Sequence, residues 1–213
     1  MPTRQLLAFV ALLTFSSAGF AQKWEFGGLG GWGSYRNRPV TGGTGNAEAG
    51  FDSGVAAGVF VGNNMYRYVG GEVRYTFQQN NLQVSSGSTK FNFTGRAHAI
   101  HYDIVFHATP VGSRVRPFVS AGGGVKLYEG TGKEASVQPL SSYAILTKTN
   151  QWTGLVSVGG GIKVAASKHV NLRIEVRDYL TPFPTDVVTP VPPAKIGGWL
   201  HDLIPMFGLS ITW

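Results

Sequence analysis

Along most of this chain, large apolar residues alternate with small or polar ones. The stretch 199–213 shows the pattern most plainly, because one parity is held by Trp199, His201, Leu203, Pro205, Phe207, Leu209, Ile211 and Trp213. The other parity holds mainly glycine, serine, threonine, an acid and a few apolar residues. A period of two is that of a β-strand, whose successive side chains point to opposite faces. We therefore predict a strand here, and we expect it to pair with the first strand and so close a barrel.

The same alternation recurs in seven earlier segments, which are 23–35, 51–62, 66–77, 90–108, 117–128, 151–165 and 170–179. The connections between the segments are short turns and long polar stretches in strict alternation, the long ones being 36–50, 78–89, 129–150 and 180–198. Short turns on the periplasmic side and long loops outside are typical of barrels in outer membranes. The pattern thus predicts an all-β fold, an eight-stranded antiparallel up-and-down transmembrane β-barrel with four exposed extracellular loops.

Charged residues lie on the small-residue parity, which we expect to face the lumen, while the large apolar parity faces lipid. A soluble barrel would have the opposite facing. Opposite charges in a narrow lumen should pair, because an unpaired buried charge is costly. This favours a polar plug over the alternative of a narrow, gated ion channel. The predicted lumen charge network is Glu25, Asp52, Glu72, Arg74, His101, Asp103, Lys126, Lys163, Arg173, Glu175, Arg177 and Asp202.

Aromatic residues stand near the ends of the predicted strands. Trp24, Trp32, Trp199 and Trp213 are expected to form the girdles that mark the two membrane interfaces of a barrel. The alternative is that they pack in the core of a soluble β-sandwich. At the end of the sequence, Phe207, Leu209, Ile211 and Trp213 form an apolar series that closes on an aromatic residue. We expect the outer-membrane assembly machinery to recognise this series as a signal.

The first 21 residues have the form of a cleaved signal peptide, with a basic start, an apolar centre and a small-residue end at Ala21. The predicted organisation is therefore a signal peptide over 1–21 and one barrel domain over 22–213. Cysteine is absent from the sequence, so disulfides and thiolate metal sites are excluded. The formal net charge is +7, or +6 without Arg4 of the signal peptide, and the excess lies at both predicted rims. There it suits lipid and lipopolysaccharide phosphates and not nucleic acid, with ordinary snorkelling of the bases at the interface as the alternative.

One pair of residues has catalytic chemistry, since His101 and Asp103 share a parity on one predicted strand. With a nucleophile they would suit an enzyme that modifies lipid A, but no serine or other nucleophile can be assigned to them. A structural role for His101 in the lumen is the favoured interpretation. The triple glycines 122–124 and 159–161 lack the features of a phosphate loop and suit close packing of curved strands. We predict no catalytic residue, no cofactor site and no metal site.

Four segments resemble the bacterial outer-membrane β-barrel domain family, the OmpA/OmpX kind of eight-stranded barrel. They are VRPFVSAGGGVKLY (115–128), VGGGIKV (158–164), LRIEVRDYL (172–180) and the terminal GLSITW, which ends on Trp213 where the family usually has Phe. The resemblance implies location in the outer membrane and a role in membrane stabilisation, adhesion or host interaction. We expect a monomer that contacts membrane lipid and lipopolysaccharide, and that uses the assembly machinery during biogenesis.

Overall fold

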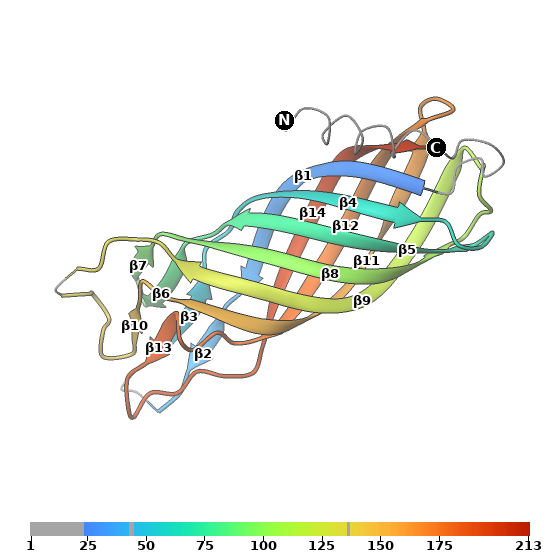
Figure 1. Ribbon diagram of the computed structural model, residues 1–213. Coiled ribbons are helices and arrows are strands. Elements are labelled where there is room, and N and C mark those ends of the chain that lie inside the picture. Colours follow the sequence, from blue (N-terminus) through green and yellow to red (C-terminus); the bar gives the residue numbers. More distant parts are fainter. Residues whose placement is uncertain (1–23, 43–44, 136) are drawn as a thin grey trace, which may run out of the picture.

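A closed barrel of eight antiparallel strands forms the body of the protein (Figure 1). The computed structural model describes residues 24–42, 45–135 and 137–213. The barrel strands are β1 (Trp24–Arg36), β4 (Gly54–Asn63), β5 (Val69–Gln79), β8 (Gly95–His107), β9 (Val115–Gly130), β11 (Asn150–Ala165), β12 (Val170–Pro182) and β14 (Trp199–Thr212). Each pairs with its neighbour in chain order, so the predicted all-β, up-and-down barrel is confirmed. None of the described residues forms a helix long and apolar enough to cross a bilayer.

The last strand closes the barrel on the first one. β14 pairs with β12 along one edge and with β1 along the other, in a register that sets Glu25 opposite Thr212. Beyond that pair, Trp24 and Trp213 exchange two backbone hydrogen bonds of 3.2 Å. The closure predicted from the alternation in 199–213 is therefore confirmed.

The two ends of the barrel differ in their connections. Short turns over 64–68, 108–114 and 166–169 lie at the end that also holds Trp213, which we call the turn end. The long connections all lie at the opposite end, which we call the loop end (Figure 1). The proposed signal peptide and the start of the predicted domain, residues 1–23, lie outside the described residues.

The long connections, predicted only as four exposed polar loops, contain regular structure of their own. They contain β2 (Arg38–Val40), β3 (Ala47–Phe51), β6 (Leu82–Ser86), β7 (Thr89–Phe93), β10 (Ala144–Leu146) and β13 (Val188–Pro190). The first four strands form one sheet in the order β2-β3-β6-β7, and β10 pairs with β13. The predicted strand 90–108 is in fact two strands, β7 and β8, which are separated at Thr94.

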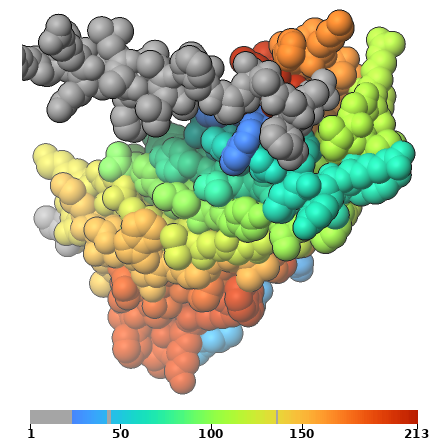
Figure 2. Space-filling view, turned by 45° about the vertical axis from the view of Figure 1, so that its right-hand side comes forward, coloured from blue at the N-terminus to red at the C-terminus, as the bar shows by residue number. Residues whose placement is uncertain are grey.

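These connections pack into one body that we call the cap, made of the described residues within 37–53, 80–94, 131–149 and 183–198. A β-bridge between Thr41 and Lys195 joins the first connection to the last. In Figure 2 these connections, coloured light blue and red, project together at the bottom of the view. The apolar core of the cap continues onto three residues of the barrel. The core is Val40, Ala47, Ala49, Phe51, Leu82, Val84, Phe93, Ala97, Tyr128, Ala144, Leu146, Phe183, Val187, Val188, Ala194, Ile196 and Leu200.

The barrel wall has its large side chains outside and a narrow interior. Val119, Ile174 and Phe207 are each more than half exposed on the outer face. On the inner face, a Cβ at Gly122 would lie 1.9 Å from the carbonyl oxygen of Tyr102 on β8. Glycine is therefore required at position 122, where β8 and β9 lie close together on the inner face of the barrel.

Candidate functional site

The lumen holds ten charged side chains, each of which is no more than 5% exposed. They come from every barrel strand except β4, and the alternation of each strand directs them inward. Five are acidic and five are basic, so their formal charges cancel. They are Glu25, Glu72, Asp103, Glu175 and Asp202, and Arg74, Lys126, Lys163, Arg173 and Arg177.

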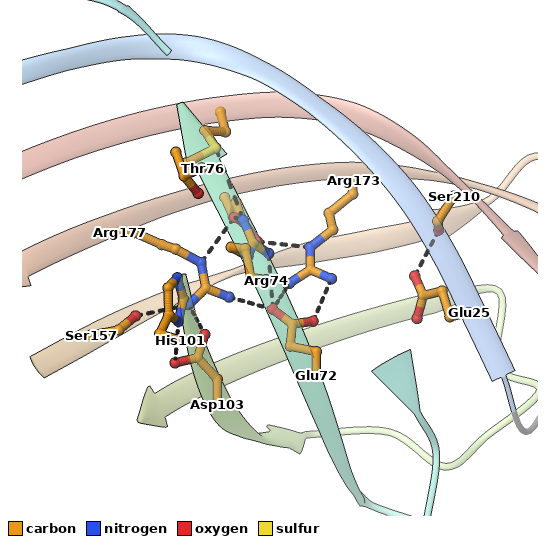
Figure 3. A network of polar contacts seen from close by, with 12 residues as sticks. Glu25, Glu72, Arg74, Thr76, His101, Asp103, Ser157, Arg173, Arg177 and Ser210 are labelled. Carbon is orange, nitrogen blue, oxygen red and sulfur yellow. Dashed lines mark hydrogen bonds and ion pairs between the residues drawn. The ribbon is translucent and has the colours of Figure 1, made fainter. Parts of the chain in front are cut away.

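Two carboxylates and three guanidinium groups form the centre of this network (Figure 3). Glu72 accepts hydrogen bonds from Arg74, Arg173 and Arg177 at 2.6–3.0 Å. Glu175 is bonded to the same three arginines, with distances of 2.7 Å to Nε of Arg173 and 3.0 Å to Nε of Arg177. Each acid therefore binds three bases, which offsets the cost of removing all five charges from water.

His101 and Asp103, the pair with catalytic chemistry, belong to the edge of this cluster. His101 Nδ1 lies 3.0 Å from Asp103 Oδ1, and its Nε2 lies 2.8 Å from the hydroxyl of Tyr179. The other oxygen of Asp103 binds Arg177, which also donates to Ser157 Oγ at 3.1 Å. Both ring nitrogens of His101 are thus engaged inside the lumen. Among the described residues, no group of three or more His, Cys, Asp or Glu is arranged to hold a metal ion.

One ion pair lies on each side of the central cluster. Toward the turn end, Lys163 Nζ is 2.6 Å from Glu25 Oε2, and Ser210 Oγ donates to the other carboxylate oxygen at 2.6 Å, as Figure 3 shows for Glu25 and Ser210. Toward the loop end, Lys126 Nζ donates to Asp202 Oδ2 at 2.6 Å and to the hydroxyl of Tyr35 at 3.0 Å. The charged side chains in the lumen therefore form three groups along the barrel axis: one ion pair toward each end and the cluster between them.

Asp52 is not a member of the network, which corrects the prediction. It lies between β3 and β4 in the cap, where its carboxylate accepts from Lys90 Nζ at 3.3 Å and from Asn92 Nδ2 at 3.0 Å. The predicted strand 51–62 was too long at its start, because the chain enters the barrel only at Gly54. Without Asp52, the six acids expected in the lumen become the five that balance the five bases.

Residues 7–186 match the model of the family described as the outer membrane protein beta-barrel domain. The chain belongs to this family. The crystal structure of Neisserial surface protein A (NspA) is similar, with 12% identity over 89% of this chain and 97% of that one, and a TM-score of 0.55. The outer membrane protein OprG from Pseudomonas aeruginosa is 12% identical over 90% and 97% of the two chains, with a TM-score of 0.56. A search of curated proteins found no match.

The similarity to these two structures, at such low identity, shows the fold alone. Together with the family, it places the chain in the bacterial outer membrane, among barrels that sit in lipid.

The four tryptophans expected in the girdles of this outer-membrane barrel all lie on its outer face, 48–56% exposed. Trp24 and Trp213 stand at the turn end, and Trp199 begins β14 at the loop end. Trp32 lies opposite Val55 on β4, one residue from the start of that strand. A fifth tryptophan, Trp152, is 58% exposed near the loop end of β11, and its parity in the predicted strand 151–165 was the signal for it.

Sequence reasoning missed a histidine–carboxylate contact on the outer face of the outer-membrane barrel. His201 Nδ1 lies 2.8 Å from Asp178 Oδ2, near the loop ends of β14 and β12. Asp178 falls within the predicted strand 170–179, where it continues the outward parity of Val176. The alternation therefore indicates that Asp178 faces outward, but it does not pair Asp178 with His201.

Proposed function

We propose that this chain is a monomeric, non-conducting outer-membrane barrel with a structural or surface-interaction role, which presents its cap outside the cell. The observation that carries the proposal is the cap itself, since four connections share one apolar core above a filled lumen. Long connections of such barrels lie outside and short turns lie in the periplasm. The cap is therefore the surface that is available to partners, while the turn end faces the periplasm.

The filled lumen supports the absence of conductance. An eight-stranded barrel has an interior that side chains can just fill, and here the central charges bind one another directly. His101, with both ring nitrogens engaged, supports a structural rather than a catalytic reading of the lumen.

Planar-bilayer recording of the purified, folded protein tests this part of the proposal. We expect no discrete current steps. A porin recorded separately in a bilayer of the same composition is the positive control. Reproducible steps from the folded monomer would show that the lumen conducts.

At the loop end, we propose that exposed bases on the barrel contact lipopolysaccharide phosphates. Arg36 ends β1 and Arg96 is the second residue of β8, and both side chains are exposed. Arg96 also pairs with Glu129, so its contact with lipid would compete with a contact inside the protein. Each such base near a membrane surface contributes about 1 kcal/mol.

We also propose that Phe207, Leu209, Ile211 and Trp213 form the signal that the assembly machinery recognises, because all four are more than half exposed on the outer face. Introducing the same side chain at two adjacent positions tests this. Leu209→Asn places an amide toward lipid and should reduce insertion, at a cost of roughly 1–3 kcal/mol. Ser210→Asn faces the lumen, where its amide can still donate to Glu25, and should be tolerated.

The fraction of each variant that is recovered folded in outer membranes is the measurement. If both substitutions reduced the recovered folded fraction equally, the proposal that the outward-facing residues form the signal would be contradicted.

A further inference from the structure

A cavity of about 370 Å³ lies at the mouth of the barrel at the turn end. All three turns at this end contribute to its lining, and the rest comes from the turn ends of β1, β9, β11, β12 and β14. The lining includes Arg114, Arg116, Lys163 and Lys168 but a single acid, Glu25. Four bases and one acid give the lining a formal charge of +3, in contrast to the balanced network deeper in the lumen.

The one acid in the lining is already engaged. Glu25 binds Lys163 through one carboxylate oxygen and Ser210 through the other, both at 2.6 Å. It therefore forms its ion pair with Lys163, and no acid among the described residues forms a salt bridge with Arg114 or Arg116.

Arg116 is the residue that points to a ligand. It is 8% exposed, and its Nη1 donates to Asn64 Oδ1 at 3.1 Å. Its Nε and Nη2 are both buried and have no hydrogen-bond partner among the described residues. These two nitrogens form one edge of the guanidinium fork, the geometry that binds a carboxylate or a phosphate through two parallel hydrogen bonds.

A second unsatisfied group lies beside the first. His107 lines a small adjoining cavity, which shares Glu25, Asn64 and Lys163 with the larger one, and both of its ring nitrogens are buried without a partner. Buried polar groups are rarely left unpaired, so two of them at one mouth indicate that a polar occupant belongs there.

We propose that this cavity binds a phosphate group, with the free edge of Arg116 as its bidentate donor. Inorganic phosphate or a phosphate monoester can carry two negative charges and so compensates more of the +3 lining than a carboxylate does. The phosphodiester of a lipid carries one charge, but both kinds of phosphate have enough oxygens for Arg116 and a second base together. The phosphate comes either from a lipid headgroup at the membrane interface or from a soluble phosphate compound. The cavity has room for the phosphate and for part of the molecule that carries it.

The test is isothermal titration calorimetry of the folded, full-length mature protein in a non-ionic detergent. Two probes are titrated separately. One probe is inorganic phosphate and the other is a short-chain phosphatidylglycerol below its micellar concentration. Saturable binding of either is expected, and Arg116→Gln should weaken it by about tenfold or more, the effect of losing charge-assisted hydrogen bonds. Arg116→Lys keeps the charge but loses the fork, and should weaken it by an intermediate factor.

Arg67→Gln is the matched control, because Arg67 is an exposed base in the turn 64–68 that does not line the cavity. This variant should bind as the unchanged protein does. Heat-modifiable gel mobility establishes that each variant is folded before it is titrated.

The two probes separate the two sources. Tighter binding of the short-chain lipid assigns a lipid headgroup, and equal binding assigns a soluble phosphate. The absence of saturable binding of both probes would overturn the proposal. Equal weakening by Arg116→Gln and Arg67→Gln would also overturn it, because it would indicate diffuse attraction to the rim.

Discussion

Glu72 and Glu175 each bind three guanidinium groups, so the charges at the centre of the lumen are shared and not paired one to one. Removing Arg177 would leave Glu72, Glu175 and Asp103 each with fewer hydrogen-bond donors. Because these groups are buried, that loss is far more costly than the loss of a surface pair.

We predict that Arg177→Met, which roughly keeps the side-chain volume, lowers the free energy of unfolding by about 3–5 kcal/mol. Arg177 is 1% exposed and binds Glu72, Glu175 and Asp103. The measurement is urea unfolding of the refolded protein in detergent. Arg96→Met is the control, because the side chain of Arg96 is 49% exposed in its pair with Glu129 and should change stability by at most about 1 kcal/mol. Similar losses in both variants would contradict a special role for the lumen.

The sequence was sufficient to choose the lumen residues wherever a strand was correctly bounded, since parity alone sets the facing of Arg74 or Glu175. It was insufficient to pair them, because partners such as Arg173 and Glu72 are 101 residues apart. The error occurred at a strand end. Asp52 was placed inside a barrel strand, although that strand begins only at Gly54, because the alternation weakens where a strand leaves the barrel.

Among the elements, β8 and β9 show what a narrow barrel requires of its backbone. A Cβ at Gly122 would meet the carbonyl oxygen of Tyr102 at 1.9 Å and Asp103 Oδ1 at 2.4 Å. The absence of a side chain at Gly122 therefore allows β8 and β9 to lie this close together, and it leaves room for the carboxylate of Asp103.

Gly122→Ala should destabilise the barrel by at least about 1–3 kcal/mol, because the added methyl group overpacks a rigid backbone contact. Gly154→Ala on β11 is the matched control, since a Cβ there would have no atom within 4 Å and should change stability by no more than about 0.5 kcal/mol. The difference between their urea unfolding midpoints measures the effect. Equal midpoints would show that β8 and β9 can move apart.

Strand length explains which elements could be predicted. The barrel strands have 10–16 residues, enough for a period of two to be unmistakable. The cap strands have three to five residues, and each connection supplies only a few apolar side chains, such as Leu82 and Val84 from β6. Their shared core exists only once the four connections meet, so no single window of the sequence indicates it.

At the scale of the whole molecule, two bodies with opposite organisation are joined end to end. The barrel has a polar interior and an apolar outer face, whereas the cap has an apolar interior. Tyr128 connects them, because it stacks on Phe51 of the cap with ring centroids 4.8 Å apart while its hydroxyl is 2.9 Å from Thr181 Oγ1 in the barrel.

We predict that the cap can open while the barrel stays folded. Leu146→Ala removes a fully buried side chain from the cap core and should destabilise the cap by about 2–5 kcal/mol. Limited proteolysis should then cut the four connections faster, with heat-modifiable mobility unchanged. Ile145→Ala, at the neighbouring and 38% exposed position of β10, should leave the cleavage rate nearly unchanged. If the barrel unfolded together with the cap, the two bodies would be one cooperative unit.

The hydrogen bonds between Trp24 and Trp213 make the ring of strands continuous, so β1 is first only in the order of synthesis. A chain joined between these two residues and cut within 166–169 would retain the eight strand pairings of the barrel. Circular permutation at exposed turns is generally tolerated. The closed ring of strands therefore has no first or last member, and only the order of the chain distinguishes β1 from β14.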